Sequence, residues 1–305
     1  MMKRKTTAFF VAFAIIVVAV LAPVTSALAD TTSYVALGAD LTPEQRETVL
    51  SLLGVKEDEL TEDNLVTVTH DDEAKYLGAV LGSDAIGSKA LSSCKVVQRE
   101  NGYGLHVETH NLTLVSENML KGALATAGLK DADVVVAAPT PISGTAALLG
   151  AMEAYAKMSG TVIPADLVAA ATSELLTSGK LSEILGDPDK IEQVISAVKG
   201  IVAGRDLTDE NEIRSVISEV ASKAGVTMSD SEVDMVLGVM KQLASMDLDA
   251  ETLIEQAKTI YSGLQASGID LSQFGIDEKL LNKAADKAPG LVDKLLGWFG
   301  SAFQN

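Results

Sequence analysis

The residues that most suggest a ligand site lie between an apolar run and a helical stretch, in DVVVAAPTPISGTAALLG at 133–150. Free backbone N–H groups at a helix start, together with the helix dipole, attract anions. A glycine there would let a ligand approach the backbone, and neighbouring hydroxyls would add donors. We therefore predict a polar or anionic ligand site in the loop 139–145, formed by Thr140, Ser143, Gly144 and Thr145.

An alternative stays open for this loop, namely that Ser143 or Thr145 only caps the helix that follows. The loop lacks the Lys that follows the second Gly of a phosphate-binding P-loop, and the chain has no G-x-G-x-x-G fingerprint. Neither of these two phosphate-binding motifs is therefore predicted.

A second group consists of His106, Glu108 and His110, in a segment that we interpret as a strand. Alternate residues of a strand share one face, and neighbours two apart lie about 6.6 Å from each other. Two of them could share a metal with His70 or with an acid from elsewhere, because zinc takes such ligands. The alternative is a polar row facing solvent, with the apolar residues between them pointing inward.

No catalytic residue is predicted. The chain lacks the G-x-S-x-G motif of serine hydrolases, and its single Cys94 lies in an apolar strand-like segment, where we expect a core residue. Carboxylate catalysis is harder to exclude, because the chain has 42 acidic residues. The acids at 71–73 and 209–210 lie where helices are expected to begin, and we interpret both groups as helix-start acids. No cofactor motif is found.

The first half of the chain alternates expected strands and helices in the order β-α-β-α-β-β-α-β-α, which predicts a mixed sheet covered by helices. Thr42, Pro43 and Gln45 have the types and spacing of a capping box. Asn101-Gly102 predicts a hairpin between two strands within 90–115. The other expected strands are 33–38, 65–70 and 133–138, and the helices that follow the capping box are 71–82, 116–129 and 146–158.

After residue 158 the apolar residues keep helical spacing, which predicts a bundle of antiparallel helices. Helix starts are expected at Asp187-Pro188 and at the Ser229–Glu232 box, and helix ends near Gly204, Gly225 and Gly268. The fold class is thus α+β or α/β, a mixed sheet followed by a helical bundle. The expected domains are 30–158 (α/β), 159–288 (helical) and an amphipathic C-terminal helix at 289–305.

That C-terminal helix contains the only Trp of the chain. It could dock on the body, on a partner or on a membrane surface, and we favour the body, because membrane-surface helices are usually rich in Lys and Arg.

The first 29 residues have the features of a secretory signal peptide. Three basic residues precede an apolar run of 14 residues at 8–21, and Ala27-Leu28-Ala29 predicts cleavage after Ala29. The run is short for a transmembrane helix, which needs about 20 residues. We therefore expect an extracellular or cell-envelope protein, without a transmembrane segment after cleavage; an uncleaved anchor is the alternative.

The expected mature chain, 30–305, is strongly acidic. Without Lys3, Arg4 and Lys5 the formal net charge of −18 becomes −21. Such a surface repels nucleic acid and favours cations or basic partners. A single Cys also means that no internal disulfide holds the fold.

Several short motifs occur in an order that resembles a known family. They are LGADLT, KYLG, IGSKALSS, VETHNLTLV, ALATAGLKDADVVVAAP and ISGTAALLGAMEAY. Over about 36–265 the chain resembles the YpuA-like exported family of Gram-positive bacteria, the domain of unknown function DUF1002. The resemblance implies an exported, envelope-associated protein and supplies no catalytic residues. It places Leu105, Val107, Thr109, Asn111 and Thr113 in the family pattern and both histidines of the second group in variable positions.

We therefore predict a secreted or envelope-associated binding protein whose partner is an unknown envelope protein or a cell-wall component. The alternative is an extracellular enzyme that acts on cell-wall material by carboxylate catalysis. Converging carboxylates with shifted pKa values would favour the enzyme. An exposed apolar patch on the helical half would favour the interaction protein.

Overall fold

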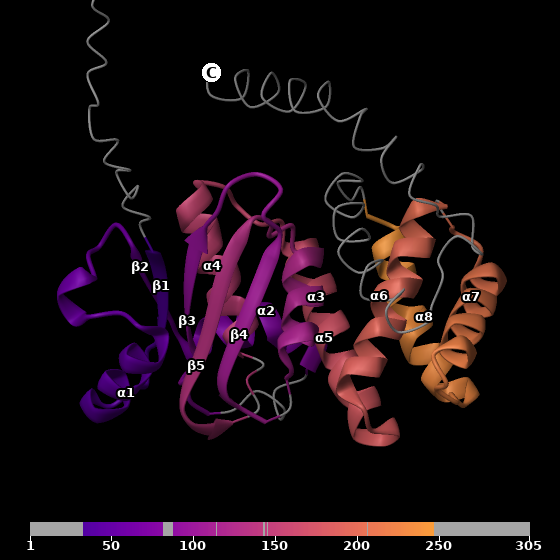
Figure 1. Cartoon of the computed structure of the whole chain (residues 1–305), viewed down its shortest axis with the longest axis horizontal. Helices are drawn as coiled ribbons and strands as arrows, with labels where there is room; N and C mark the ends of the chain where they lie inside the picture. The colour runs from indigo at the N-terminus through magenta and orange to yellow at the C-terminus, as the bar shows by residue number, and fades with distance from the viewer. Residues whose placement is uncertain are drawn as a thin grey trace, which may run out of the picture. The chain divides into compact units, whose positions relative to one another are not determined.

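The computed structural model describes residues 33–81, 88–113, 115–142, 144, 146–205 and 207–246 (Figure 1). The expected signal peptide, the helix end near Gly268 and the C-terminal helix at 289–305 lie outside the described residues. No helix among the described residues is both long and apolar enough to cross a membrane.

Five strands form one mixed sheet in the order β2-β1-β3-β5-β4, which confirms the predicted sheet class (Figure 1). β1 runs parallel to β2 and antiparallel to β3, while β5 runs antiparallel to β3 and parallel to β4. The strands are β1 (Ser33–Gly38), β2 (Leu65–Val68), β3 (Ser93–Gln98), β4 (Leu105–Leu112) and β5 (Ala132–Ile142).

The predicted hairpin at Asn101-Gly102 is wrong, because β5 lies between β3 and β4 and pairs with both. The segment 99–104 crosses the start of β5 instead of closing a two-strand ribbon. Oδ1 of Asp131 accepts hydrogen bonds from the backbone N–H groups of Gly102 and Gly104, each at 3.0 Å. A six-residue connection is long enough to span two strand spacings of about 4.8 Å each.

The helices of the first half begin and end close to the predicted residues. They are α1 (Pro43–Leu53), α2 (His70–Leu81), α3 (Glu117–Thr126) and α4 (Ala146–Ser159), while the short 3-10 helix η1 (Glu57–Glu59) was not predicted. The capping box of Thr42 and Gln45 is present at α1, and Ser116 caps α3 by accepting from the N–H of Met119. Local sequence signals therefore fix these starts.

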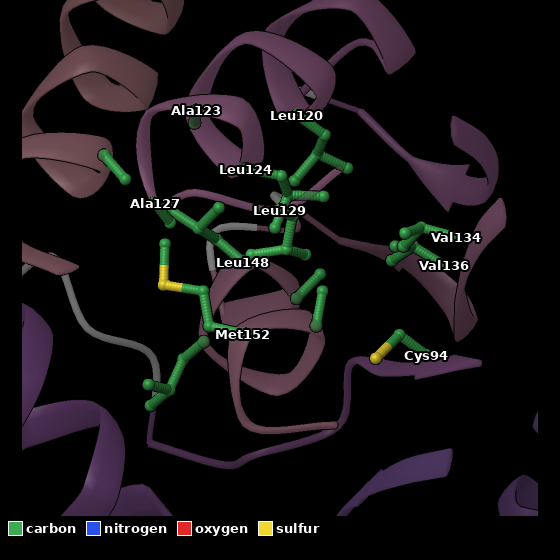
Figure 2. Close-up of a cluster of buried hydrophobic side chains, with 14 of the residues drawn as sticks. Cys94, Leu120, Ala123, Leu124, Ala127, Leu129, Val134, Val136, Leu148 and Met152 are labelled. Atoms are coloured by element: carbon green, nitrogen blue, oxygen red, sulfur yellow. The ribbon is translucent and has the colours of Figure 1, made fainter. Parts of the chain in front are cut away.

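The two faces of the sheet support separate cores. On one face α1 packs against alternate strand residues, Val35, Leu37 and Ala137 among them. On the other face α4 crosses β1, β2 and β3, and α3 packs against β4. Figure 2 shows this second core, where Leu120 and Leu124 of α3 and Leu148 and Met152 of α4 lie with Cys94, Val134 and Val136 of the strands. Cys94 is fully buried and its thiol is free, as expected.

Four helices make up the described second half: α5 (Ala165–Leu185), α6 (Pro188–Gly204), α7 (Glu210–Lys223) and α8 (Asp230–Ala244). Asp187 caps α6, and the Ser229–Glu232 capping box starts α8, both as predicted. The 21 residues of α5 serve two cores, since Ala171 and Leu175 pack with the sheet whereas Leu181 packs with α6, α7 and α8. The division of the chain at residue 158 stays a prediction.

Candidate functional site

The carboxyl ends of β1 and β2 meet at one place because the two strands are parallel neighbours, with Gly38 paired to Val68. Ligands of α/β sheets commonly bind beyond the carboxyl ends of such strands. Asp40 follows β1, and its Oδ2 accepts from the N–H of Ala90 at 2.8 Å. The backbone of Ala90 can approach β1 here because residue 38 is glycine; a Cβ atom on Gly38 would lie 2.2 Å from the carbonyl oxygen of Ala90.

Thr69 and Asp72 cap the start of α2 at the end of β2. Oδ2 of Asp72 accepts from the N–H of Thr69 at 2.9 Å and from its hydroxyl at 2.5 Å, while the N–H of Asp72 donates back to that hydroxyl at 3.2 Å. These bonds hold the pKa of Asp72 below its ordinary value, led by the hydroxyl of Thr69. Asp72 is therefore a fixed negative charge.

Glu73 points inward, unlike an ordinary helix-start acid. It is 3% exposed, and its Oε1 is buried without a hydrogen-bond partner among the described residues. Oε2 lies 3.9 Å from Nδ1 of His70, too far for a hydrogen bond. Burial, reinforced by the charges of Asp40 and Asp72, raises the pKa of Glu73 to about 7.

His70 lies next to this buried carboxyl and is itself partly exposed to solvent. Its Nδ1 atom is buried and also lacks a partner among the described residues, although the side chain as a whole is 42% exposed. An unpaired buried polar group costs about 1–3 kcal/mol. Two such groups side by side are unusual in a native structure and mark a place where a donor from outside would be stabilising.

Glu153 of α4 adds a further carboxyl to this edge. Burial, followed by the charge of Asp72, raises its pKa to about 7, and the ammonium group of Lys75 offsets part of that rise. Lys75 itself lies exposed over the ring of Tyr76, 4.5 Å from its centroid. Lys75, which acts on Asp72 and Glu153, therefore lies at the surface and not among the buried carboxyls.

Together these residues form what we call the carboxyl cluster, defined as Asp40, His70, Asp72, Glu73 and Glu153. Among the described residues no group of three or more His, Cys, Asp or Glu has the geometry of a metal site. The Glu73 oxygen that has no partner among the described residues suits a positively charged N–H donor, and the two carboxyls of raised pKa suit proton transfer.

Of the residues predicted in the 139–145 loop, Thr140 and Gly144 are described, whereas Ser143 and Thr145 lie outside the described residues. β5 extends to Ile142, so the loop is shorter than the sequence suggested. Gly144 has a φ of +88°, and a Cβ atom there would lie 2.9 Å from the side chain of Leu112. Leu112 therefore occupies the space beside Gly144, and the ligand site in this loop stays a prediction.

The alternating residues of β4 lie on one face as the spacing predicts, but they do not converge. Nε2 of His110 lies 3.1 Å from Oε1 of Glu108. The ring of His106 instead packs on Tyr103, with ring centroids 4.7 Å apart. A metal shared by these residues stays a prediction, and within the described part of the chain nothing brings His70 to them.

The residues of the carboxyl cluster were not predicted from the sequence as a site. Asp72 lies in the first turn of α2, as the interpretation of a helix-start acid predicts, whereas its pairing with Thr69 was not predicted. The inward direction of Glu73 follows from the tertiary position of α2 beside α4 and α5, for which the sequence carries no local signal. Glu153 stands between apolar residues in GAMEAYA, a charge on a buried-looking helix, which is a signal that could have found it.

Comparison with known proteins gives two similarities. A family model described as "Protein of unknown function (DUF1002)" matches residues 37–260. The Bacillus subtilis (strain 168) protein described as "Uncharacterized protein YpuA" is 35% identical over 216 residues, covering 70% of this chain and 73% of the relative. No solved structure matches the chain. All residues of the carboxyl cluster fall within the matched range.

Proposed function

We propose that this chain is an exported binding protein for a cationic ligand. The chain belongs to the DUF1002 family of proteins of unknown function. The ligand class is a primary amine or a guanidinium group, held by the carboxyl cluster. The observation that carries the proposal is the buried Glu73 carboxyl, one oxygen of which has no hydrogen-bond partner within the described part of the chain, next to His70 Nδ1, which has none there either. A cationic N–H group would give Glu73 both a donor and a counter-charge.

The charge of the whole chain supports the same ligand class. A formal net charge of −18 attracts cations to the surface and raises their local concentration. The ligand would reach Glu73 past His70, whose side chain is 42% exposed whereas that of Glu73 is 4% exposed. Asp72, fixed by Thr69, supplies a constant negative charge beside that path.

Thermal unfolding with lysine methyl ester or arginine methyl ester tests this proposal. A ligand at 100 times its dissociation constant stabilises a protein by about 2.7 kcal/mol. We expect a rise in Tm for the wild type, no rise for Glu73→Gln, and an unchanged rise for the exposed control Glu219→Gln in α7. Work at about 0.15 M salt suppresses non-specific binding to the acidic surface. An equal rise in all three proteins would contradict a site at Glu73.

Export is part of the proposal and rests on the first 29 residues. N-terminal sequencing of the protein from a producing culture tests it, with Asp30 expected as the first residue of the mature chain. Retention of the apolar run in the membrane fraction would instead indicate an uncleaved anchor.

A second candidate is an enzyme that acts on cell-wall material by carboxylate catalysis. Glu73 and Glu153 both have a pKa of about 7, the range that suits a general acid at neutral pH. Release of soluble fragments from cell walls by the wild type, lost in Glu73→Gln and Glu153→Gln, would favour this candidate. In the absence of release by the wild type, the binding function stands alone.

The second half of the chain offers less support for a partner surface. The large hydrophobic residues exposed in the described part are Tyr103, Val162 and Ile184, which lie in three different segments. We therefore propose an envelope partner only as a molecule that carries the cationic group.

A polar ligand at the 139–145 loop is best tested by Thr140→Ala, because changes at Gly144 would disturb its packing against Leu112.

A further inference from the structure

Three charged side chains lie buried together where α3, α5 and α6 meet. Glu174 of α5 is 1% exposed, and Lys199 and Glu192 of α6 are 3% and 4% exposed. Charged residues are almost never buried to this extent unless they are paired. The group holds two carboxyls and one ammonium, so its charges balance only if one carboxyl keeps a proton.

Lys199 is satisfied by three acceptors. Its Nζ donates to Oε1 of Glu174 at 2.6 Å, to the hydroxyl of Thr126 at 3.0 Å and to the carbonyl oxygen of Gly122 at 3.1 Å. The hydroxyl of Thr126 in turn donates to the other oxygen of Glu174. Glu174 is therefore the carboxylate that balances the ammonium group.

Glu192 has hydroxyl partners, and no cation of the described residues lies within hydrogen-bond distance of it. Ser178 donates to its Oε2 at 3.0 Å and Ser196 to its Oε1 at 2.8 Å. Burial, followed by the negative charge of Glu174, raises the pKa of Glu192 to about 8, although Lys199 offsets part of the rise. Glu192 is therefore the carboxyl that keeps the proton at neutral pH.

The groups around Glu192 come from three helices. α3 supplies the uncharged Gly122 and Thr126, α5 supplies Glu174 and Ser178, and α6 itself supplies Ser196 and Lys199. Glu174 and Lys199 are the charged groups that act on Glu192. α7 and α8 pack on the apolar side of α6, which carries Ile191, Val194, Ile195 and Val198.

We infer that the junction of α3, α5 and α6 is a proton-dependent latch, closed while one proton stays on its two carboxyls and loosened when that proton leaves. The inference does not rest on the proposed ligand function. Loss of the proton leaves two negative charges and one positive charge in a buried space, a state that opening to water relieves.

The direction of the pH dependence follows from the raised pKa of Glu192. The folded junction binds a proton that the opened junction releases between pH 4.5, the ordinary value, and about 8. The stabilisation of the closed junction by this proton is therefore complete below pH 4.5 and is lost as the pH rises through about 8. Over that interval one proton changes the opening constant about tenfold per pH unit, and the dependence levels off above it.

Amide hydrogen exchange of α6 tests the latch with the wild type and Glu192→Gln measured side by side between pH 5 and pH 9. Gln keeps the size of Glu192 and both hydroxyl partners but does not titrate. At each pH the ratio of the two exchange rates cancels the intrinsic pH effect and the contributions of groups that do not interact with Glu192. We expect the ratio of wild-type to variant rate to rise about tenfold per pH unit up to about 8 and then to flatten.

Ser196→Ala is the matched control, because it removes one partner of Glu192 and keeps the titrating carboxyl. Its α6 exchange should retain the wild-type slope. A ratio between wild type and Glu192→Gln that stays constant with pH would overturn the latch. Should Glu192→Gln fail to fold, α6 is compared with α1 of the wild type after correction for intrinsic rates, and an equal slope in both helices would overturn it as well.

Discussion

A Cβ atom placed on Gly122 of α3 would lie 2.2 Å from Oε1 of Glu192 in α6. The same atom would lie 3.1 Å from Oε1 of Glu174. A glycine inside a helix costs about 1 kcal/mol relative to alanine. Glycine at position 122 therefore makes α3 less stable than alanine would, but it leaves room for two buried carboxyls beside the backbone of α3.

Gly122→Ala should lower the free energy of unfolding by about 1–3 kcal/mol, because the overpacking of Glu192 outweighs the gain in helix propensity. Gly179→Ala in α5 is the matched control. A Cβ atom there would meet no atom of the described residues within 4 Å, so alanine should stabilise by about 0.5–1 kcal/mol. Denaturant unfolding of both variants measures the change in the free energy of unfolding, which should be a loss for Gly122→Ala and a gain for Gly179→Ala. Stabilisation by Gly122→Ala would show that Glu192 does not need this space.

Asp131 should be required for the crossing of 99–104 over β5. Asp131→Ala loses the acceptor for two backbone N–H groups and places a φ of +49° on alanine, for an expected loss of about 2–4 kcal/mol. Asp131→Asn keeps an oxygen acceptor and tolerates that φ, so its loss should stay under about 1 kcal/mol. Equal losses in the two variants, measured by chemical denaturation, would argue against this role of the side chain.

Cys94 should be chemically inert in the folded protein. Burial raises the pKa of its thiol to about 12, and the residue is fully buried. A disulfide reagent at pH 8 should therefore label it at the rate of unfolding, and at once in denaturant. Fast labelling of the folded protein would show that the core of Figure 2 opens readily.

Much of the fold could be predicted from local signals. The capping residues Thr42, Ser116 and Ser229 start helices where the sequence indicates, and the apolar periodicity separates a mixed sheet from helices. The place of β5 between β3 and β4 could not be predicted from Asn101-Gly102, because a turn signal describes four residues and strand order depends on contacts made later in the chain.

The carboxyl cluster was harder to predict than the fold. Asp72 and Glu73 are adjacent acids at a helix start, yet one caps the helix and the other is buried. Their difference arises from the position of α2 against its neighbours and not from either residue type. The same is true of Glu192, whose burial depends on a glycine in a distant helix.

Glu73 should make the protein less stable as the pH rises. Its pKa is raised from 4.5 to about 7, so its stabilising proton is fully present below pH 4.5 and is lost as the pH rises through about 7. Glu73→Gln is neutral throughout, and the wild type should therefore lose up to about 3 kcal/mol relative to this variant between pH 4.5 and 7. Unfolding free energies of the two proteins at matched pH values measure the difference, and parallel curves would contradict the buried, protonated carboxyl.

Calorimetric titration with lysine methyl ester at pH 7, in two buffers of different ionisation enthalpy, tests the central claim most directly. A cation that binds beside Glu73 favours its ionised form, and a group with a pKa of about 7 would then release about half a proton per ligand. We predict binding with this proton release in the wild type and loss of both in Glu73→Gln. Binding without proton release, or the same release in Glu73→Gln, would contradict a cation site at the carboxyl cluster.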